Sequence, residues 1–361
     1  EAVLGGDAPL CDLLRSRKVK TAQDLLHLAP WELRDWLLVS EAEAAAVVAR
    51  AWAACAAPVT TAWDALASSS GAPAPTPLAQ LNEALGGGVS GAFVEAAGPP
   101  GAGKTQLCLH IAALTAASGG EVFWLDAERT FSAPRVLELL QAICRARAPS
   151  GSAGVDPEAL ALAALQRIRR RVCTSLQELH TLTADLLQRA QQGDVLPALL
   201  VVDSIAALAR NTGDAMANQH AVIPQRQRAL SALAGLLKML AATPIAPDTS
   251  TPPGIIVTNQ VMGDPTGGGS KVALGHVWYH AVNWRLVLSY LPPGDSRGHG
   301  TKERSADGQR FLHVEKSPCA AALTMPYVIG PGGLQEANAI SSPGAVVQGH
   351  GEPPPLRWAA Q

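Results

Sequence analysis

A glycine-rich loop that ends in Gly-Lys-Thr constrains the fold of this 361-residue chain more than any other feature. The loop follows the apolar run 92–97 and precedes the helix-like run 106–117. A strand, a loop and a helix in this order are the setting in which such a loop binds phosphate, because its glycines let consecutive backbone N–H groups face one anion. A chance match to this pattern occurs on the order of one time in a hundred in a chain of this size. The predicted nucleotide-binding residues are Gly98, Pro99, Pro100, Gly101, Ala102, Gly103, Lys104, Thr105 and, directly after the loop, Gln106.

Two residues at the end of the loop have specific roles in phosphate chemistry. Lys104 supplies a point charge for the β- and γ-phosphates of ATP, and the Thr105 hydroxyl is placed to ligate Mg²⁺. The metal also needs an anionic anchor, and Asp203 fits this role because it ends the apolar run 199–203. The alternative for Asp203 is a residue that caps the next helix. The loop makes the metal role the favoured interpretation.

Hydrolysis of ATP requires a group that activates the attacking water. Glu128 follows a second apolar strand and is the candidate base, although a solvated loop glutamate would have the same sequence context. Gln260 follows a third strand, and its amide is the candidate sensor of the γ-phosphate. The carboxyl ends of adjacent parallel strands meet at one edge of an open α/β sheet. We therefore predict Lys104, Glu128 and Gln260 as the catalytic residues.

Apolar runs that alternate with helix-like stretches predict an α/β fold with a mainly parallel sheet. The expected strands are 92–97, 121–126, 199–203, 254–259, 283–290 and 309–316, of which the first four are central. The expected domains are a small helical domain at 1–57, a linker at 58–77, an ATPase domain at 78–335 and a disordered tail at 336–361. Within the helical domain, Thr21 is expected to cap one helix and Ser40 to form a capping box with Glu43.

The composition limits the classes of function that are open to the chain. The net charge of −2 gives no overall attraction for nucleic acid, so DNA contacts would have to come from local basic loops. No membrane span is expected, and the first residues lack the basic region of a signal peptide. Six cysteines without C-x-x-C spacing argue against zinc and indicate reduced thiols in the cytosol or nucleus. The basic run 167–171 is expected to be a solvated helix end rather than a DNA patch.

Together these motifs resemble those of the RecA-like strand-exchange ATPases. The order is the phosphate loop, Leu-Asp-Ala-Glu-Arg-Thr-Phe at 125–131, Val-Val-Asp-Ser at 201–204, Thr-Asn-Gln at 258–260 and a Gly-rich loop. Finer features, such as Glu-Lys-Ser-Pro at 315–318, are similar to the eukaryotic recombinase paralogues, above all to their B-type group. The resemblance implies a RecA-like ATPase core after a helical domain, ATP and Mg²⁺ as cofactors, and a nuclear role in homologous-recombination repair. It also implies that Glu128 activates water.

The resemblance assigns further residues by matching position. Arg135 matches an arginine that packs on adenine, and His280 matches a histidine that couples DNA to the nucleotide. The two loops that face DNA in the family correspond to about 210–225 and 261–275. The predicted DNA-binding residues are Arg210, Lys271 and His280. Single-stranded or branched DNA is the expected ligand of these loops, and a disordered surface loop is the alternative.

The linker sequence indicates whether the chain assembles with copies of itself into filaments or with other proteins into a complex. The family's recombinases polymerise through a Phe-x-x-Ala motif, which here reads Val59-Thr60-Thr61-Ala62. Valine buries less area than phenylalanine, which forgoes roughly 1–2 kcal/mol of anchor energy. This departure argues against self-assembled filaments and for a hetero-oligomer with other recombinase paralogues.

The sequence is compatible with two functions. The first is a DNA-dependent ATPase that acts as a recombination mediator. The second is a non-catalytic scaffold that uses ATP structurally at a subunit interface. A RecA-core helicase or a bacterial-type repair ATPase is disfavoured, because the chain has no cysteine zinc motif and is expected to have a helical N-terminal domain.

Overall fold

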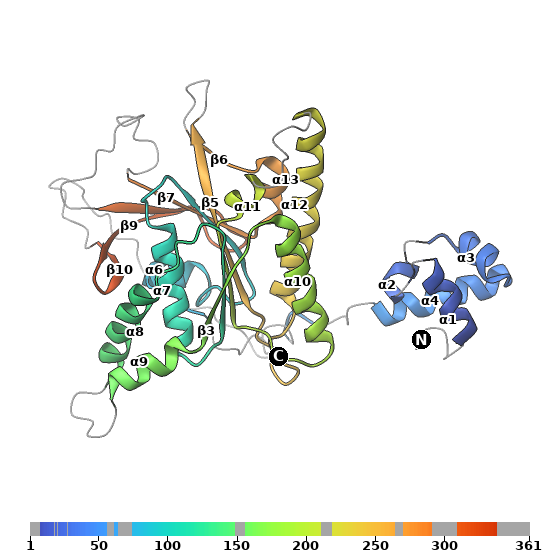
Figure 1. The fold of residues 1–361 in the computed structure, drawn as a ribbon, viewed down its shortest axis with the longest axis horizontal. Coiled ribbons are helices and arrows are strands. Elements are labelled where there is room, and N and C mark those ends of the chain that lie inside the picture. The colour runs from blue at the N-terminus through green and yellow to red at the C-terminus, as the bar shows by residue number, and fades with distance from the viewer. Residues whose placement is uncertain are drawn as a thin grey trace, which may run out of the picture. The chain divides into compact units, whose positions relative to one another are not determined.

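The computed structural model describes residues 8–17, 19, 21–26, 28–55, 61–63, 74–148, 156–210, 219–263, 270–290 and 309–337 (Figure 1). The chain divides into two compact units, Glu1–Ser68 and Ser69–Gln361. Most of the predicted linker and nearly all of the predicted tail lie outside the described residues. Within the described residues, we find no helix that is both long and apolar enough to cross a membrane.

The first unit is a small helical cluster with its own core. Its described helices are α1 (Ala8–Ser16), α2 (Ala22–Leu25), α3 (Pro30–Leu37) and α4 (Glu41–Cys55). Leu14, Leu33 and Ala44 are among the residues buried between them. The capping box before α4 is confirmed: the Glu43 N–H donates to Ser40 Oγ at 3.3 Å, and the Ser40 N–H donates to Glu43 Oε2 at 2.8 Å. The predicted Thr21 cap is also confirmed, because its Oγ1 accepts the Asp24 N–H at 3.1 Å. These bonds satisfy backbone donors that a helix start leaves without partners.

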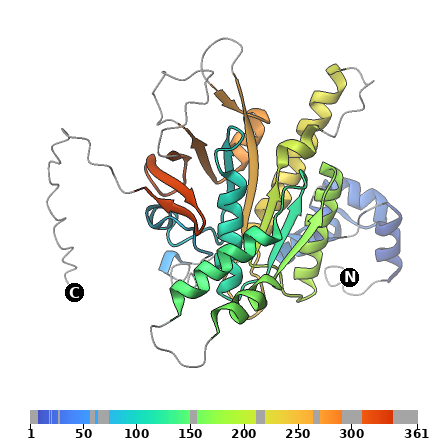
Figure 2. The same cartoon turned by 60° about the vertical axis from the view of Figure 1, so that its left-hand side comes forward.

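The second unit is built on a single sheet, which has ten strands in the described residues. They are β1 (Phe93–Gly98), β2 (Val122–Asp126), β3 (Ile168–Val172), β4 (Leu199–Asp203), β5 (Gly254–Gly263), β6 (Ser270–Val272), β7 (Trp284–Ser289), β8 (Arg310–Lys316), β9 (Leu323–Gly330) and β10 (Gly333–Glu336). The strand order is β10-β9-β8-β7-β1-β5-β4-β2-β3, and β6 pairs with β5 outside this path. The strands from β7 to β3 are parallel, whereas β8, β9 and β10 add an antiparallel extension, whose strands are red in Figure 2.

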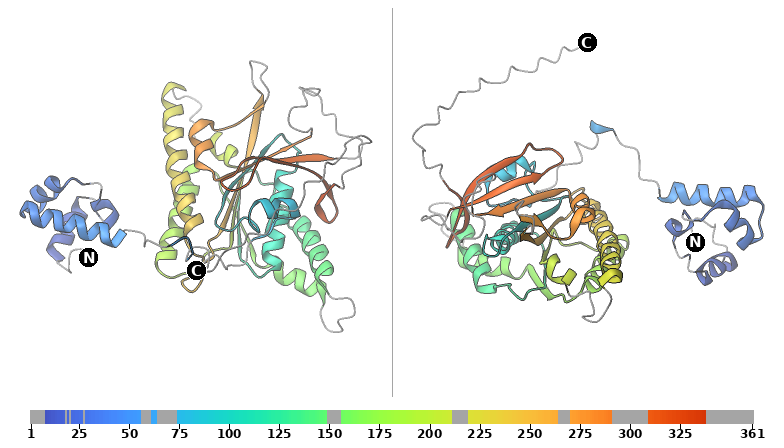
Figure 3. Two further views of the ribbon diagram at one scale, coloured as in Figure 1. Left: turned by 180° about the vertical axis from the view of Figure 1, so that it is seen from behind. Right: turned by 90° about the horizontal axis from the view of Figure 1, so that it is seen from above.

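Helices cover both faces of the parallel part of the sheet (Figures 1 and 3). They are α6 (Ala79–Ala84), α7 (Lys104–Ala117), α8 (Ala133–Arg147), α9 (Pro157–Leu165), α10 (Leu176–Gln191), α11 (Ile205–Arg210), α12 (Gln219–Ala242) and α13 (Gly275–Ala281). Side chains of a strand alternate between the faces. Leu199 and Val201 of β4 therefore pack in the core with α7 and α8, whereas Leu200 and Val202 pack with α10 and α12. This burial on both faces explains the continuous apolar runs of the central strands.

All six predicted strands are present, and the first four are adjacent at the centre of the sheet. The prediction for 167–171 was wrong: residues 168–172 form β3, an edge strand that pairs with β2 from Val122↔Ile168 onward. Its arginines are exposed and engage acidic neighbours, as with Arg170 and Asp126 at 2.8 Å. The predicted tail also begins too early, because Glu336 is the last residue of β10.

Candidate nucleotide-binding site

The phosphate loop joins β1 to α7 and has no room for side chains at its glycines. A Cβ on Gly98 would lie 2.4 Å from the Leu288 carbonyl oxygen of β7. Gly103 has φ 111° and caps α7, and a Cβ there would lie 2.6 Å from Ile329 Cδ1. At Gly98 the neighbouring atom is backbone and cannot move aside, and at Gly103 the positive φ favours glycine. The loop backbone and the start of α7 therefore form a cradle of the kind that accepts a phosphate group.

Two tyrosines of the antiparallel side of the sheet hold the loop in place. Tyr290, which follows β7, donates its hydroxyl to the Pro100 carbonyl at 2.9 Å. Tyr327 of β9 is fully buried and donates to the Ala102 carbonyl at 2.6 Å. Burial raises the pKa of Tyr327 well above its usual value, so its hydroxyl remains a neutral donor. These contacts were not predicted from the sequence.

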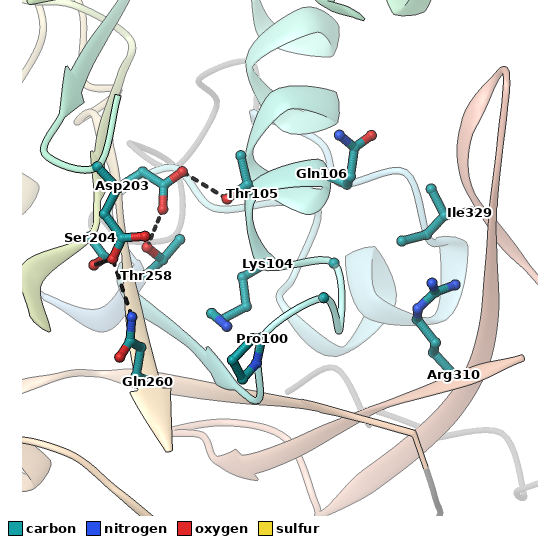
Figure 4. Close-up of a pocket in the computed structure, with 13 residues that line it drawn as sticks. Pro100, Lys104, Thr105, Gln106, Asp203, Ser204, Thr258, Gln260, Arg310 and Ile329 are labelled. Atoms are coloured by element: carbon teal, nitrogen blue, oxygen red, sulfur yellow. Dashed lines mark hydrogen bonds between the residues drawn. The ribbon is translucent and has the colours of Figure 1, made fainter. Parts of the chain in front are cut away.

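Lys104 lies at the first position of α7 and folds back over the loop. Its Nζ donates to the Gly98 carbonyl at 2.7 Å and to the Pro99 carbonyl at 3.0 Å. Burial lowers the pKa of this ammonium group, while the carboxylates of Asp203 and Glu128 act in the opposite direction. The predicted phosphate-binding lysine is thus at the loop and faces the acidic side of the site (Figure 4).

Asp203 ends β4 and is surrounded by hydroxyl groups. Its Oδ2 accepts from Thr105 Oγ1 at 2.8 Å and from Thr130 Oγ1 at 3.3 Å, and its Oδ1 accepts from Thr258 Oγ1 at 2.5 Å. Burial raises the pKa of Asp203, and the hydroxyl donors partly offset this effect. Figure 4 shows the bonds to Thr105 and Thr258 as dashed lines.

The predicted magnesium ligands are therefore adjacent. No group of three or more His, Cys, Asp or Glu residues that could hold a metal occurs in the described part of the chain. A metal between Thr105 and Asp203 would depend on one hydroxyl, one carboxylate, and phosphate or water oxygens. Mg²⁺ prefers such a set of few protein ligands, so the residues present fit this ion.

A tight turn after β2 presents Glu128 to the same site. The buried Asp126 carboxylate accepts the N–H groups of Thr130 at 3.0 Å and Phe131 at 3.3 Å, which closes the turn around Glu128. The Ala127 N–H donates to the Asp203 carbonyl at 2.7 Å and ties the ends of β2 and β4 together. The fold thus holds the backbone at Glu128 in place, although the residue itself is exposed.

The Glu128 carboxylate is bonded to the predicted sensor. Its Oε1 accepts from Ser204 Oγ at 2.6 Å and from Gln260 Nε2 at 3.2 Å. Arg210 completes this group: its Nη1 donates to Gln260 Oε1 at 2.8 Å, and its Nη2 lies 3.7 Å from Glu128 Oε1. Arg210 was predicted to contact DNA, and the structure places its guanidinium at the nucleotide site.

Lys104, Thr105, Asp203, Glu128 and Gln260 line one cleft of about 450 Å³. Its lining residues are Pro100, Gly101, Gly103, Lys104, Thr105, Gln106, Glu128, Asp203, Ser204, Thr258, Gln260, Arg310 and Ile329. Arg310 and Ile329 come from β8 and β9 and lie on the opposite side of the loop from Asp203 (Figure 4). Neither residue was predicted, because no local motif in the sequence marks them.

Several predicted residues do not line the cleft: Gly98, Pro99 and Ala102 of the loop, Arg210, Arg135 and His280. Lys271 is only partly described. Arg135 is held by Gln106 Oε1 at 3.0 Å and by the Gly330 carbonyl at 2.7 Å, so it links α7 to the turn after β9. His280 is exposed in the last turn of α13. The backbone of Lys271 belongs to β6, and its side chain lies outside the described residues. The roles assigned to Arg135, His280 and Lys271 stay predictions.

Comparisons with known proteins identify the relatives of this fold and site. Residues 74–337 match the Rad51 family model, and this match spans all ten strands of the sheet. The chain is 30% identical to "DNA repair protein RAD51 homolog 2" of Homo sapiens over 367 residues, which cover 92% of the chain and 87% of the human protein. It is 27% identical to the Arabidopsis thaliana protein of the same name over 391 residues, covering 96% and 92% of the two chains. It is also 29% identical to "DNA repair and recombination protein RadB" of Halobacterium salinarum over 246 residues, covering 65% and 89%. On this evidence the chain belongs to the Rad51 family, as a RecA-like α/β protein of the Rad51 paralogue type.

Proposed function

We propose that this protein binds ATP with Mg²⁺ and hydrolyses it weakly in response to DNA, as a mediator of homologous-recombination repair. The supporting observation is the convergence of Thr105, Asp203, Glu128 and Gln260 on one cleft from four different elements. A loop that binds phosphate only for anchoring needs no carboxylate bonded to an amide beside it. The full set favours turnover.

The chain's own residues account for the steps of such a reaction. The loop amides and Lys104 would hold the β- and γ-phosphates, with phosphate oxygens replacing the carbonyls of Gly98 and Pro99 as partners of Nζ. Thr105 and Asp203 would hold Mg²⁺, which neutralises the charge that develops on the phosphates. Glu128 would accept a proton from the attacking water. Gln260 is bonded to the Glu128 carboxylate and would orient that carboxylate.

ATP turnover with and without single-stranded DNA tests this proposal. We expect Glu128→Gln to lower turnover by about 100-fold or more, because general-base catalysis contributes at least that factor, while nucleotide binding persists. Lys104→Ala should lower both binding and turnover. Glu83→Gln on α6, an exposed glutamate, is the matched control and should not differ from the wild type. Equal rates in the wild type and Lys104→Ala would refute the proposal.

The relatives are named as DNA repair proteins, and we extend that role to this chain as part of the proposal. It would act in the nucleus, on single-stranded or branched DNA, within a complex of recombinase paralogues. The altered linker motif, whose first two residues lie outside the described residues, supports a hetero-oligomer over a self-filament. Co-purification of tagged chain with other paralogues from nuclear extract is the measurement for this part.

A structural role for ATP is the second candidate. The observation in its favour is that Arg210, a predicted DNA contact, is engaged with Glu128 and Gln260. Under this alternative, Glu128→Gln leaves repair intact in cells, while Lys104→Ala disrupts partner binding. A repair defect in Glu128→Gln cells with the complex still assembled would exclude it.

A further inference from the structure

A buried glutamate outside the cleft is bonded to three different elements. Glu95 of β1 is fully buried. Its Oε1 accepts from Asn259 Nδ2 at 2.6 Å and from Trp278 Nε1 at 2.8 Å, and its Oε2 accepts from Arg285 Nε at 2.5 Å. The donors lie on β5, α13 and β7. The Arg285 charge compensates a carboxylate that would otherwise be costly to bury.

The bond to Asn259 connects Glu95 with the predicted sensor. Asn259 is itself fully buried, and its Oδ1 accepts the N–H of Gln260 at 2.8 Å. Its Nδ2 also donates to the Ala273 carbonyl at 3.1 Å, and the Ala273 N–H returns to the Gln260 carbonyl at 2.9 Å. One side chain therefore fixes the Gln260 peptide and closes the base of the segment 261–272.

The bond to Trp278 connects Glu95 with the helix that follows this segment. The Trp278 ring is fully buried and packs edge-on against Phe93 of β1 with centroids 5.6 Å apart. Lys316 of β8 secures the end of the same helix by donating to the carbonyls of Tyr279 at 2.9 Å and Val282 at 2.7 Å. Helix α13 is thus attached to the sheet at its middle and at its end.

We propose that Glu95 is a positioning residue that joins the Gln260 peptide and helix α13 into one hydrogen-bonded unit. This inference rests on the proposed function, in which Gln260 contacts the nucleotide. A shift of α13 away from β1 would leave the buried Trp278 indole N–H without its partner and would remove one of the two donors to Glu95 Oε1, which is unfavourable in a buried site. A change at the cleft that moves Gln260 is therefore transmitted to α13, and a change in the arrangement of α13 is transmitted to Gln260.

Two buried tryptophans provide a matched pair of variants. Trp278→Phe removes the indole N–H that Glu95 accepts and retains an aromatic ring. Trp124→Phe is the control, because the Trp124 side chain is equally buried but its indole N–H has no hydrogen-bond partner among the described residues. Asn259→Ala cuts the connection at the other end of the unit and is the second test variant.

The measurement is hydrogen exchange of the α13 amides with and without a non-hydrolysable ATP analogue and Mg²⁺. In the wild type and Trp124→Phe, we expect the analogue to slow exchange by about fivefold or more, the lower range of coupling between sites. Trp278→Phe and Asn259→Ala should lose this slowing. The same slowing in these variants as in the wild type, or none in the wild type, would overturn the inference. Slowing in a wild type without ATP turnover would support the inference and contradict the proposed hydrolysis.

Discussion

Acidification should loosen the contact between the phosphate-loop helix and the last strand of the sheet through a single histidine. His110 lies on α7 with 7% of its surface exposed, and its Nδ1 accepts the Leu334 N–H of β10 at 3.1 Å. An acceptor at Nδ1 requires that this nitrogen is unprotonated, so the neutral imidazole is the form that fits. Burial, with the Arg135 charge as a smaller cause, lowers the pKa of His110 from 6.5 to about 4.

The sign and size of the effect follow from proton linkage. Between pH 6.5 and about 4 the unfolded chain protonates His110 whereas the folded chain does not. Stability is therefore complete above pH 6.5 and is lost as the pH falls through this window. A tenfold difference in proton affinity is worth about 1.4 kcal/mol, which makes the loss about 3 kcal/mol by pH 4.

Urea unfolding at several pH values measures this loss. His110→Asn is the comparison, because its side-chain oxygen can accept the Leu334 N–H and does not titrate. Other groups titrate equally in both proteins, so the difference between the two stability profiles isolates His110. We expect the wild type to lose about 3 kcal/mol more than His110→Asn between pH 6.5 and 4. Profiles that stay parallel would refute the reasoning.

Three further predictions concern the loop and the thiols. Tyr327→Phe removes the hydroxyl that holds the loop and should weaken nucleotide affinity by about two- to tenfold, measured with a fluorescent ATP analogue. Gly98→Ala places a methyl group 2.4 Å from the Leu288 carbonyl and should cost about 2 kcal/mol or more in urea unfolding; a cost below about 0.5 kcal/mol would contradict the close approach. Cys55 and Cys319 are exposed and the other four cysteines are buried, so a colorimetric thiol reagent should modify two thiols rapidly and the rest only on unfolding.

The parallel part of the sheet was predictable because burial on both faces leaves a mark on the sequence. β4 reads Leu-Leu-Val-Val-Asp, and each of its apolar residues is fully buried. The sequence of β3, Ile-Arg-Arg-Arg-Val, has no such apolar run. The strand pairs on one side only, and Arg169, Arg170 and Arg171 are accommodated because their side chains reach solvent and acidic neighbours. An edge strand rich in charge is a common way to prevent further pairing, and its sequence does not differ from that of a solvated helix.

The acidic half of the site was predictable and the opposite half was not. Asp203 ends β4, and Gln260 lies where the parallel pairing of β5 with β1 ends. A polar residue at that position of a parallel sheet indicates a site. Tyr290 reaches the loop from the end of β7 and Tyr327 from β9, while Arg310 of β8 lines the same cleft, so their approach depends on strand order and not on spacing along the chain. One signal was available: the chain has only three tyrosines, and two of them hold the loop.

The bonding of Glu128 bears on whether ATP is turned over or only held. Three donors, from Ser204, Gln260 and Arg210, face its Oε1. Among the described residues, no donor is bonded to Oε2, so this oxygen is available as an acceptor. A carboxylate that is held through one oxygen while the other remains available is consistent with the general base of the proposed reaction. A glutamate in a purely structural site has no need for such orientation, because it would only have to avoid repelling the phosphates. This orientation supports the proposed hydrolysis rather than the structural alternative.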